Sequence, residues 1–198
     1  MEQREIRDLI ISAMVLAFVF AYSGIGNFEK LIFDFPIALL VISLGFILHE
    51  LGHRQIARRF KCYAEFRLWK QGLLLAVLIA FISSGNFIFA APGAVMIYPR
   101  ADLWGRTASL SRRSAGLISI AGPIVNIILA VSFLILNLVY PLTVFGTNVF
   151  QYGALINTWL ALFNLIPIPP LDGSKIFAWN LKIWGAMIAA AVALMFFV

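Results

Sequence analysis

The sequence predicts an all-α, polytopic membrane protein with about five to six transmembrane helices. The chain has 198 residues, of which 62% are hydrophobic and only 12% are charged. A soluble domain of this length would need a more strongly charged surface. Several apolar runs are long enough to cross the hydrocarbon core of a bilayer. We therefore expect residues 1–198 to form one integral membrane domain with little of the chain outside it.

Six apolar segments follow one another along the chain. The first, residues 9–22, ends at a Ser-Gly-Ile-Gly stretch and has no small-residue cleavage site, so we expect a permanent span rather than a signal peptide. The second, residues 35–58, carries both histidines of the chain near its end. The others are residues 72–98, 115–140, 149–168 and 181–198.

The segment 72–98 decides the topology, because it is interrupted at residues 83–86 and again at Pro92. If it crossed the membrane, the basic loops on either side of it would face opposite sides, which the positive-inside rule disfavours. If it enters and returns, both loops are cytoplasmic, and Lys30 alone of the fifteen Lys and Arg residues lies outside. Non-helical backbone at this depth must be buried or line a cavity. We therefore predict a re-entrant element at 72–98, which could be a β-hairpin.

The basic residues belong to these loops. Those before the re-entrant element are Arg54, Arg58, Arg59, Lys61, Arg67 and Lys70, and those after it are Arg100, Arg106, Arg112 and Arg113. The net charge of +6 is thus explained by the positive-inside rule and by contact with membrane lipid, and no nucleic-acid partner is expected. The small size and the lack of a targeting segment suit a prokaryotic cell membrane.

The stretch "HELGH" at residues 49–53 carries the chemistry. Residues four apart share one face of a helix, about 6 Å apart along its axis, so His49 and His53 can both bind one metal ion. Glu50 lies beside them. This H-E-x-x-H pattern is that of zinc hydrolases, in which the carboxylate is the base toward water.

A structural reading is that the histidines only pair with other polar groups in the helix bundle. Ionisable residues in a span are costly, however, and both histidines of the chain occur at the spacing that makes a metal site. A catalytic zinc needs a third protein ligand, and Asp172 is the obvious candidate. A re-entrant segment 72–98 places Asp172 on the same side of the membrane as the histidines, whereas a full span would not.

Three motifs together resemble those of the site-2 proteases, zinc metalloproteases that cut inside membranes. They are "HELGH" (49–53), "AGPIVN" (121–126) and "NLIPIPPLDG" (164–173), within a catalytic core at about 36–173. The resemblance implies that His49, His53 and Asp172 bind one Zn²⁺ per chain and that Glu50 is the catalytic base. Asn164 would lie near the active site and bind substrate. The chain lacks the PDZ and CBS domains of larger members.

Two motif features have open alternatives. Asn126 either reaches the site, where it would bind substrate, or hydrogen-bonds a neighbouring helix. Pro167, Pro169 and Pro170 either unwind the chain to face a cavity or substrate, or simply end the span.

The expected function is hydrolysis of peptide bonds within or near transmembrane segments of membrane proteins, as in regulated intramembrane proteolysis. The active site would face the cytoplasmic side of a multi-pass protein. A metal transporter is a rival reading, although it would be expected to have more ligands along a path across the bilayer. A non-catalytic scaffold with a zinc site is another, and loss of the motif glutamate would indicate it, but Glu50 is present. The oligomeric state is left open.

Overall fold

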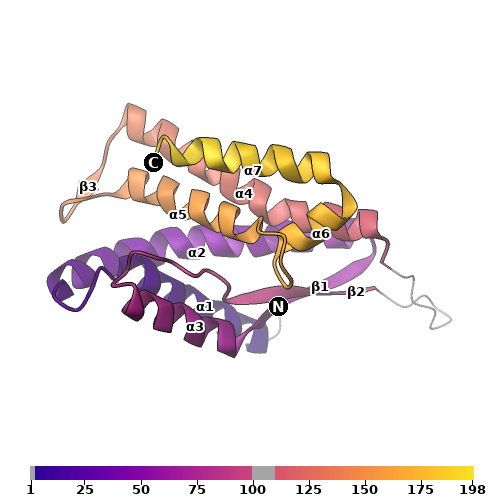
Figure 1. Cartoon of the computed structure of the whole chain (residues 1–198), viewed down its shortest axis with the longest axis horizontal. Coiled ribbons are helices and arrows are strands. Elements are labelled where there is room, and N and C mark those ends of the chain that lie inside the picture. Colours follow the sequence, from indigo (N-terminus) through magenta and orange to yellow (C-terminus); the bar gives the residue numbers. More distant parts are fainter. Residues whose placement is uncertain (1–2, 100–109) are drawn as a thin grey trace.

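The computed structural model describes residues 3–99 and 110–198, and it is mostly helical (Figure 1). Arg100 and Arg106 of the second basic loop lie outside the described residues. The elements in chain order are α1 (Gln3–Ala21), α2 (Phe28–Arg59), β1 (Cys62–Leu68), α3 (Lys70–Ile82), β2 (Gly93–Pro99), α4 (Arg112–Val139), β3 (Thr143–Val144), β4 (Thr147–Asn148), α5 (Val149–Asn164), α6 (Asp172–Trp179) and α7 (Leu181–Met195).

The long helix α2 lies at the centre of the bundle. It packs against α1 on one side and against α4 and α5 on the other. Figure 1 shows α4, α5 and α7 on one side of α2, with α1 and α3 on the opposite side. The short helix α6 packs against α4 and α7 near the end of the bundle that carries the β1–β2 sheet. The core between these layers is built from small and branched apolar side chains such as Ala38, Ile42 and Ala154.

Two of the described helices have the length and composition of membrane spans. Among the described residues, α2 and α4 are each long and apolar enough to cross a membrane by length and composition, and α3 and α7 are shorter apolar helices. The outer faces of the bundle expose large apolar side chains, and Leu40, Ile128 and Leu138 each expose more than half of their surface. Exposed apolar surface of this extent is expected of a protein in contact with lipid rather than with water.

Residues 72–98 do not form a β-hairpin. Their first arm is the helix α3, which is followed by a turn at residues 83–86, an extended stretch and then the strand β2. The run from Leu73 to Ile82 contains no helix breaker, and a helix satisfies its own backbone hydrogen bonds in an apolar setting. Ser84 and Gly85 both have positive φ angles, of 52° and 82°, and reverse the chain after the helix.

The strand β2 pairs instead with β1, in the region that the sequence indicated to be a basic loop. The pairing is antiparallel and joins Cys62 to Pro99 and Leu68 to Gly93. Because basic residues lie in and around β1, its sequence does not indicate a strand, although Ala64 and Phe66 of this strand are buried. Since Cys62 and Pro99 are paired, the chain between them leaves and returns to the same place. The re-entrant topology itself stays a prediction.

Local signals position the helices that follow. The Ser111 hydroxyl accepts a hydrogen bond from the backbone N–H of Ser114 at the start of α4, and the Asn148 side chain does the same for Gln151 at the start of α5. Between these helices, β3 and β4 pair antiparallel, and Phe145 and Gly146 at the turn have positive φ angles. The tight hairpin makes α4 and α5 adjacent.

Candidate active site

The helix α2 brings His49 and His53 together, one turn apart. Their Nε2 atoms are 3.0 Å from each other. Both side chains are buried, with 4% and 2% of their surface exposed. The i, i+4 spacing of the motif accounts for this arrangement, because both imidazoles leave the same face of the helix.

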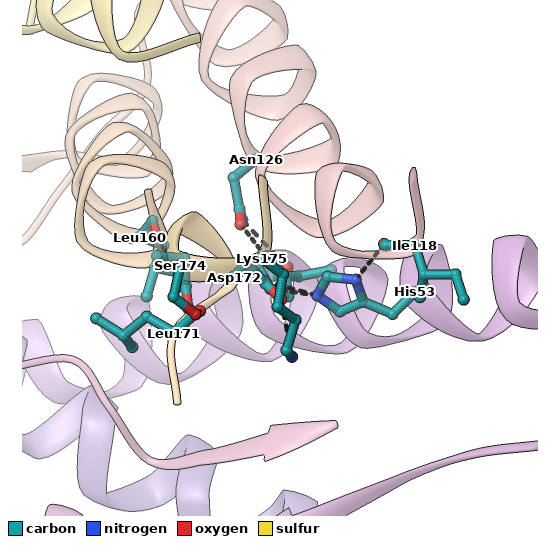
Figure 2. Close-up of polar contacts among 11 residues, drawn as sticks. His53, Ile118, Asn126, Leu160, Leu171, Asp172, Ser174 and Lys175 are labelled. Atoms are coloured by element: carbon teal, nitrogen blue, oxygen red, sulfur yellow. Dashed lines mark hydrogen bonds and ion pairs between the residues drawn. The ribbon is translucent and has the colours of Figure 1, made fainter. Parts of the chain in front are cut away.

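Asp172 completes a group of three. Its Oδ2 atom lies 2.9 Å from Nε2 of His53 and 3.3 Å from Nε2 of His49, and its side chain is also buried (Figure 2). The helix α5 ends at Asn164, and the proline-rich stretch 165–171 is not helical. Asp172 is then the first residue of α6. The predicted juxtaposition of the two histidines with this carboxylate is thus present in the structure.

Hydrogen bonds from the other ring nitrogens fix both imidazoles. Nδ1 of His53 lies 2.8 Å from the backbone carbonyl oxygen of Ile118, and Nδ1 of His49 lies 2.5 Å from Oδ1 of Asn126. Both partners belong to α4, and both are acceptors. Each histidine therefore donates from Nδ1, and Nε2 is the ring nitrogen that faces Asp172.

The group is suited to a metal ion. One ligand atom from each of His49, His53 and Asp172 can be chosen so that all three atoms lie within 4.8 Å of one another. Two imidazoles and a carboxylate are a ligand set of catalytic zinc sites. Gly122 of α4 adds a second indication, because a Cβ atom on it would lie 2.4 Å from Nε2 of both histidines. The absence of a side chain at this position leaves room beside both nitrogen atoms.

Glu50 faces a small cavity beside this group. The cavity has a volume of about 20 Å³, which is about the room that one water molecule needs. Its polar lining comes from His49, Glu50, Asn126 and Asn164. The Oε2 atom of Glu50 is buried and has no hydrogen-bond partner among the described residues. A carboxylate oxygen is thus free to accept a proton from a molecule bound there.

The two predicted substrate-binding asparagines differ in their surroundings. Asn164 is partly buried at the end of α5, and its Nδ2 donates to the carbonyl oxygen of Leu160 at 2.9 Å, while Oδ1 makes no hydrogen bond within the described part of the chain. Asn126 is completely buried. Its Oδ1 lies against His49, and its Nδ2 donates to Asn157 and to the backbone of Gly45. Asn126 therefore both reaches the site, through His49, and hydrogen-bonds a neighbouring helix, through Asn157. Its binding of substrate stays a prediction.

Sequence reasoning missed several neighbours of the site. Asn157 has no motif around it, and its position is revealed only when α2, α4 and α5 pack together. Ala90, Pro92 and Gly93, from the stretch before and at the start of β2, line the cavity opposite α2. Lys175, one turn after Asp172, has its Nζ atom 3.9 Å from Oδ1 of Asp172. A basic residue three positions after an acidic one on a helix is the one sequence signal that could have pointed to it.

Comparison with known proteins identifies the family. Residues 37–146 and 141–197 match the model described as Peptidase family M50. The chain belongs to this family. It is the family of the site-2 proteases, so the resemblance of the three motifs is confirmed, and the chain is a zinc metalloendopeptidase of this type.

Individual relatives have names of the same kind. A candidate zinc metalloprotease of Methanocaldococcus jannaschii is 41% identical over 182 residues, which cover 92% of this chain and 87% of that protein. Another, from Bacillus subtilis strain 168, is 31% identical over 157 residues, covering 71% of this chain and 67% of that protein. A solved structure, a site-2 protease from M. jannaschii, covers 82% of this chain and 76% of its own at 18% identity, with a TM-score of 0.47.

Proposed function

We propose that this M50 peptidase is an intramembrane zinc metalloprotease, which hydrolyses peptide bonds within or near the transmembrane segments of membrane proteins. His49, His53 and Asp172 would bind one Zn²⁺ per chain, and Glu50 would be the catalytic base. One observation carries the proposal: the three ligand atoms lie close together, next to a cavity that can hold one water molecule and that Glu50 lines. The burial of this site among apolar helices supports a substrate that is itself in the membrane.

The chain's own residues supply the acid–base chemistry. When bound by the two histidines and the aspartate, zinc supplies a Lewis acid that polarises the scissile carbonyl and activates water. Glu50 accepts the proton of the attacking water at its free carboxylate oxygen and delivers it to the nitrogen of the leaving amine. Asn164 lines the same cavity, and its side-chain amide would bind the substrate and stabilise the negative charge that develops on the carbonyl oxygen.

A transmembrane substrate must unwind before it is cut, because its helical hydrogen bonds conceal the scissile bond. The strand β2 is a suitable partner for the unwound segment. Its described pairing is to β1 alone, which leaves its second edge without a strand in this part of the molecule. Gly93, the first residue of β2, lines the same cavity as Glu50. We propose that the substrate adds to this edge as an extended strand, with its scissile bond beside Glu50.

Ile88 and Phe89, in the extended stretch before β2, are held against α5. The indole N–H of Trp159 donates to the carbonyl oxygen of Ile88 at 3.1 Å. Phe89 packs edge-to-face on Phe163, with the ring centroids 5.1 Å apart. These contacts keep the extended residues beside the cavity, where they would help to exclude bulk water from the reaction.

The proposed location is the cell membrane, with several spans and the active site toward the cytoplasm. The pairing of Cys62 with Pro99 supports this topology, since it brings together the two chain ends that lead into the basic loops. Arg58 and Arg59 at the end of α2, and Arg112 and Arg113 at the start of α4, would then all face the cytoplasm and the lipid headgroups.

The test is to purify the full chain in detergent, measure its zinc content and incubate it with a model peptide that contains one transmembrane helix. We expect about one zinc per chain and cleavage within the apolar segment, lost with a chelator and restored by zinc. A peptide with helix-breaking residues in the segment should be cut faster than its all-leucine counterpart. Zinc transport into vesicles without any cleavage would favour the transporter alternative and contradict the proposal.

A further inference from the structure

A chain of side-chain amides from two other helices holds His49 in place. Asn157 of α5 donates from Nδ2 to the backbone carbonyl oxygen of Gly153 at 2.9 Å. Its Oδ1 accepts from Nδ2 of Asn126, on α4, at 3.0 Å. Oδ1 of Asn126 lies 2.5 Å from Nδ1 of His49, on α2. Both asparagines are completely buried, so no solvent competes for these bonds.

Two backbone carbonyl groups set the direction of this chain of hydrogen bonds. Gly153 can only accept, so Asn157 must turn its NH₂ group toward it and its oxygen toward Asn126. The carbonyl oxygen of Gly45 lies 3.3 Å from Nδ2 of Asn126, so that Asn126 too must present its NH₂ group on this side. Its oxygen then faces His49, which is left with one role, donation from Nδ1.

Gly45, which has no side chain, allows α2, α4 and α5 to approach one another closely at this point. A Cβ atom there would lie 2.5 Å from Oδ1 of Asn157. Any larger residue would push Asn157 away and break the bond to Asn126. Gly45 lies one turn before His49 on α2, so the same helix carries both the ligand and the space for the group that orients it.

We propose that Asn126, held by Asn157, is a positioning residue of the metal site. It fixes the tautomer of His49 with the proton on Nδ1 and directs the lone pair of Nε2 toward His53 and Asp172. The inference deepens the proposed function and rests on it, since it takes His49 to be a zinc ligand. Partners of this kind set the basicity and the orientation of a ligating imidazole.

The decisive quantity is the dissociation constant for zinc, measured on the purified full chain by competition with a chelator. Asn126→Leu keeps a similar volume but removes the acceptor, and we expect zinc binding about 10–100-fold weaker. Asn157→Leu does not touch His49, yet it should weaken zinc binding in the same direction, because it frees Asn126 to turn. The double variant should be little worse than Asn126→Leu alone, since the effect of Asn157 passes through Asn126.

The chain contains a matched control. Nδ2 of Asn148, at the start of α5, donates to Oδ1 of Asn137 on α4 at 2.8 Å. This is also an asparagine pair between α4 and α5, but Asn137 is eleven positions, or about 16 Å of helix, beyond Asn126. Asn137→Leu should lower the melting temperature while leaving the zinc dissociation constant within about twofold of the wild-type value, because it removes a hydrogen bond without touching a ligand.

The possible results distinguish failure of the inference from failure of the proposed function. Unchanged zinc affinity in Asn126→Leu, or an equal loss of affinity in Asn137→Leu, would overturn the inference and leave the proposed function intact. A wild-type chain that binds no zinc would instead contradict the proposed function, and the inference with it. If Asn126→Leu does not fold, Asn157→Leu provides the same comparison from outside the contact with His49, and wild-type affinity in that variant would overturn the inference.

Discussion

Asp172 places its Oδ2 atom 2.9 Å from Nε2 of His53, although the two residues are 119 positions apart in the sequence. The contact depends on the packing of α6 against α4 and of α4 against α2. A buried carboxylate is costly unless it is paired or binds a cation. Its position between two imidazoles that donate from their far nitrogens is therefore best explained by a cation that all three side chains share.

Gly122 provides a test of the metal site that changes no ligand. Gly122→Ala would put a Cβ atom 2.4 Å from Nε2 of both His49 and His53, which is too close for both imidazoles to keep their positions as ligands. We expect the variant to lose most of its zinc and its peptide cleavage. Metal analysis of the purified protein measures the first effect directly.

The matched glycine for that experiment is Gly185, in α7. A Cβ atom on Gly185 would meet no other atom within 4 Å. Gly185→Ala should retain zinc and stabilise its helix by up to about 1 kcal/mol. Full zinc content in Gly122→Ala would show that the metal does not lie beside this glycine.

Asn164 should affect turnover without affecting the metal. Asn164→Ala removes a side chain that lines the cavity beside Glu50 but makes no hydrogen bond with the three ligands in the described structure. We expect the variant to bind zinc normally and to cleave a model transmembrane peptide about 100-fold more slowly, as for the loss of one oxyanion donor. A normal rate would remove Asn164 from the proposed mechanism.

The re-entrant topology can be tested with single cysteines. Cys62 is buried, and burial raises the pKa of its thiol, but it should still be replaced by serine before labelling. Cysteines at Lys70 and Arg112, both exposed, should react with a membrane-impermeant reagent from the same side of a sealed vesicle. A cysteine at Lys30 is the control and should react from the opposite side. Labelling of Lys70 and Arg112 from different sides would show that the segment between them crosses the membrane.

A buried ion pair fixes α1 to the rest of the protein. Glu5 of α1 is 1% exposed, pairs with Arg54 of α2 and accepts a hydrogen bond from the backbone N–H of Phe66 in β1 at 3.2 Å. Glu5→Ala would leave the partly buried guanidinium of Arg54 without its partner and the N–H of Phe66 without its acceptor. We expect a loss of about 3 kcal/mol in the free energy of unfolding, measured by denaturation in detergent.

The control for this variant is Arg7. It pairs with Asp8 at 3.2 Å, but its side chain is 64% exposed. Arg7→Ala should therefore change the free energy of unfolding by less than about 1 kcal/mol. Equal effects of Glu5→Ala and Arg7→Ala would mean that the buried pair has no special role.

The sequence predicted what depends on local spacing and on hydropathy. His49 and His53 share a helix face because four residues make about one turn, and this holds wherever the helix lies. Asp172 was predicted from topology, since the re-entrant segment and the prolines together bring it to the side of the histidines. The apolar segments around 35–58 and 115–140 are the long helices α2 and α4.

What the sequence could not show depends on contacts between distant segments. The strand β1 carries Glu65 and Arg67 and lies among basic residues, and the strand that pairs with it follows α3, so neither strand is apparent by itself. Asn157 has a role only because Gly45 admits it next to Asn126. The first arm of 72–98 is apolar throughout, and an apolar run of this length does not distinguish a helix from a strand.

The central claim is that Asp172 is a metal ligand and Glu50 a base. The two carboxylates lie in one site but have different roles in this claim. Measuring both zinc content and peptide cleavage distinguishes the two roles. Asp172→Ala leaves two histidines, too few protein ligands for a tight zinc site. Glu50→Gln leaves all three ligands but removes the group that accepts a proton.

The measurement that tests the account most directly is therefore zinc content by elemental analysis, together with the rate of cleavage of a model transmembrane peptide, in these two variants side by side. The account predicts that Glu50→Gln retains about one zinc per chain and loses cleavage by a factor of at least about 100, whereas Asp172→Ala loses both zinc and cleavage. Full zinc occupancy in Asp172→Ala, or unchanged turnover in Glu50→Gln, would contradict it.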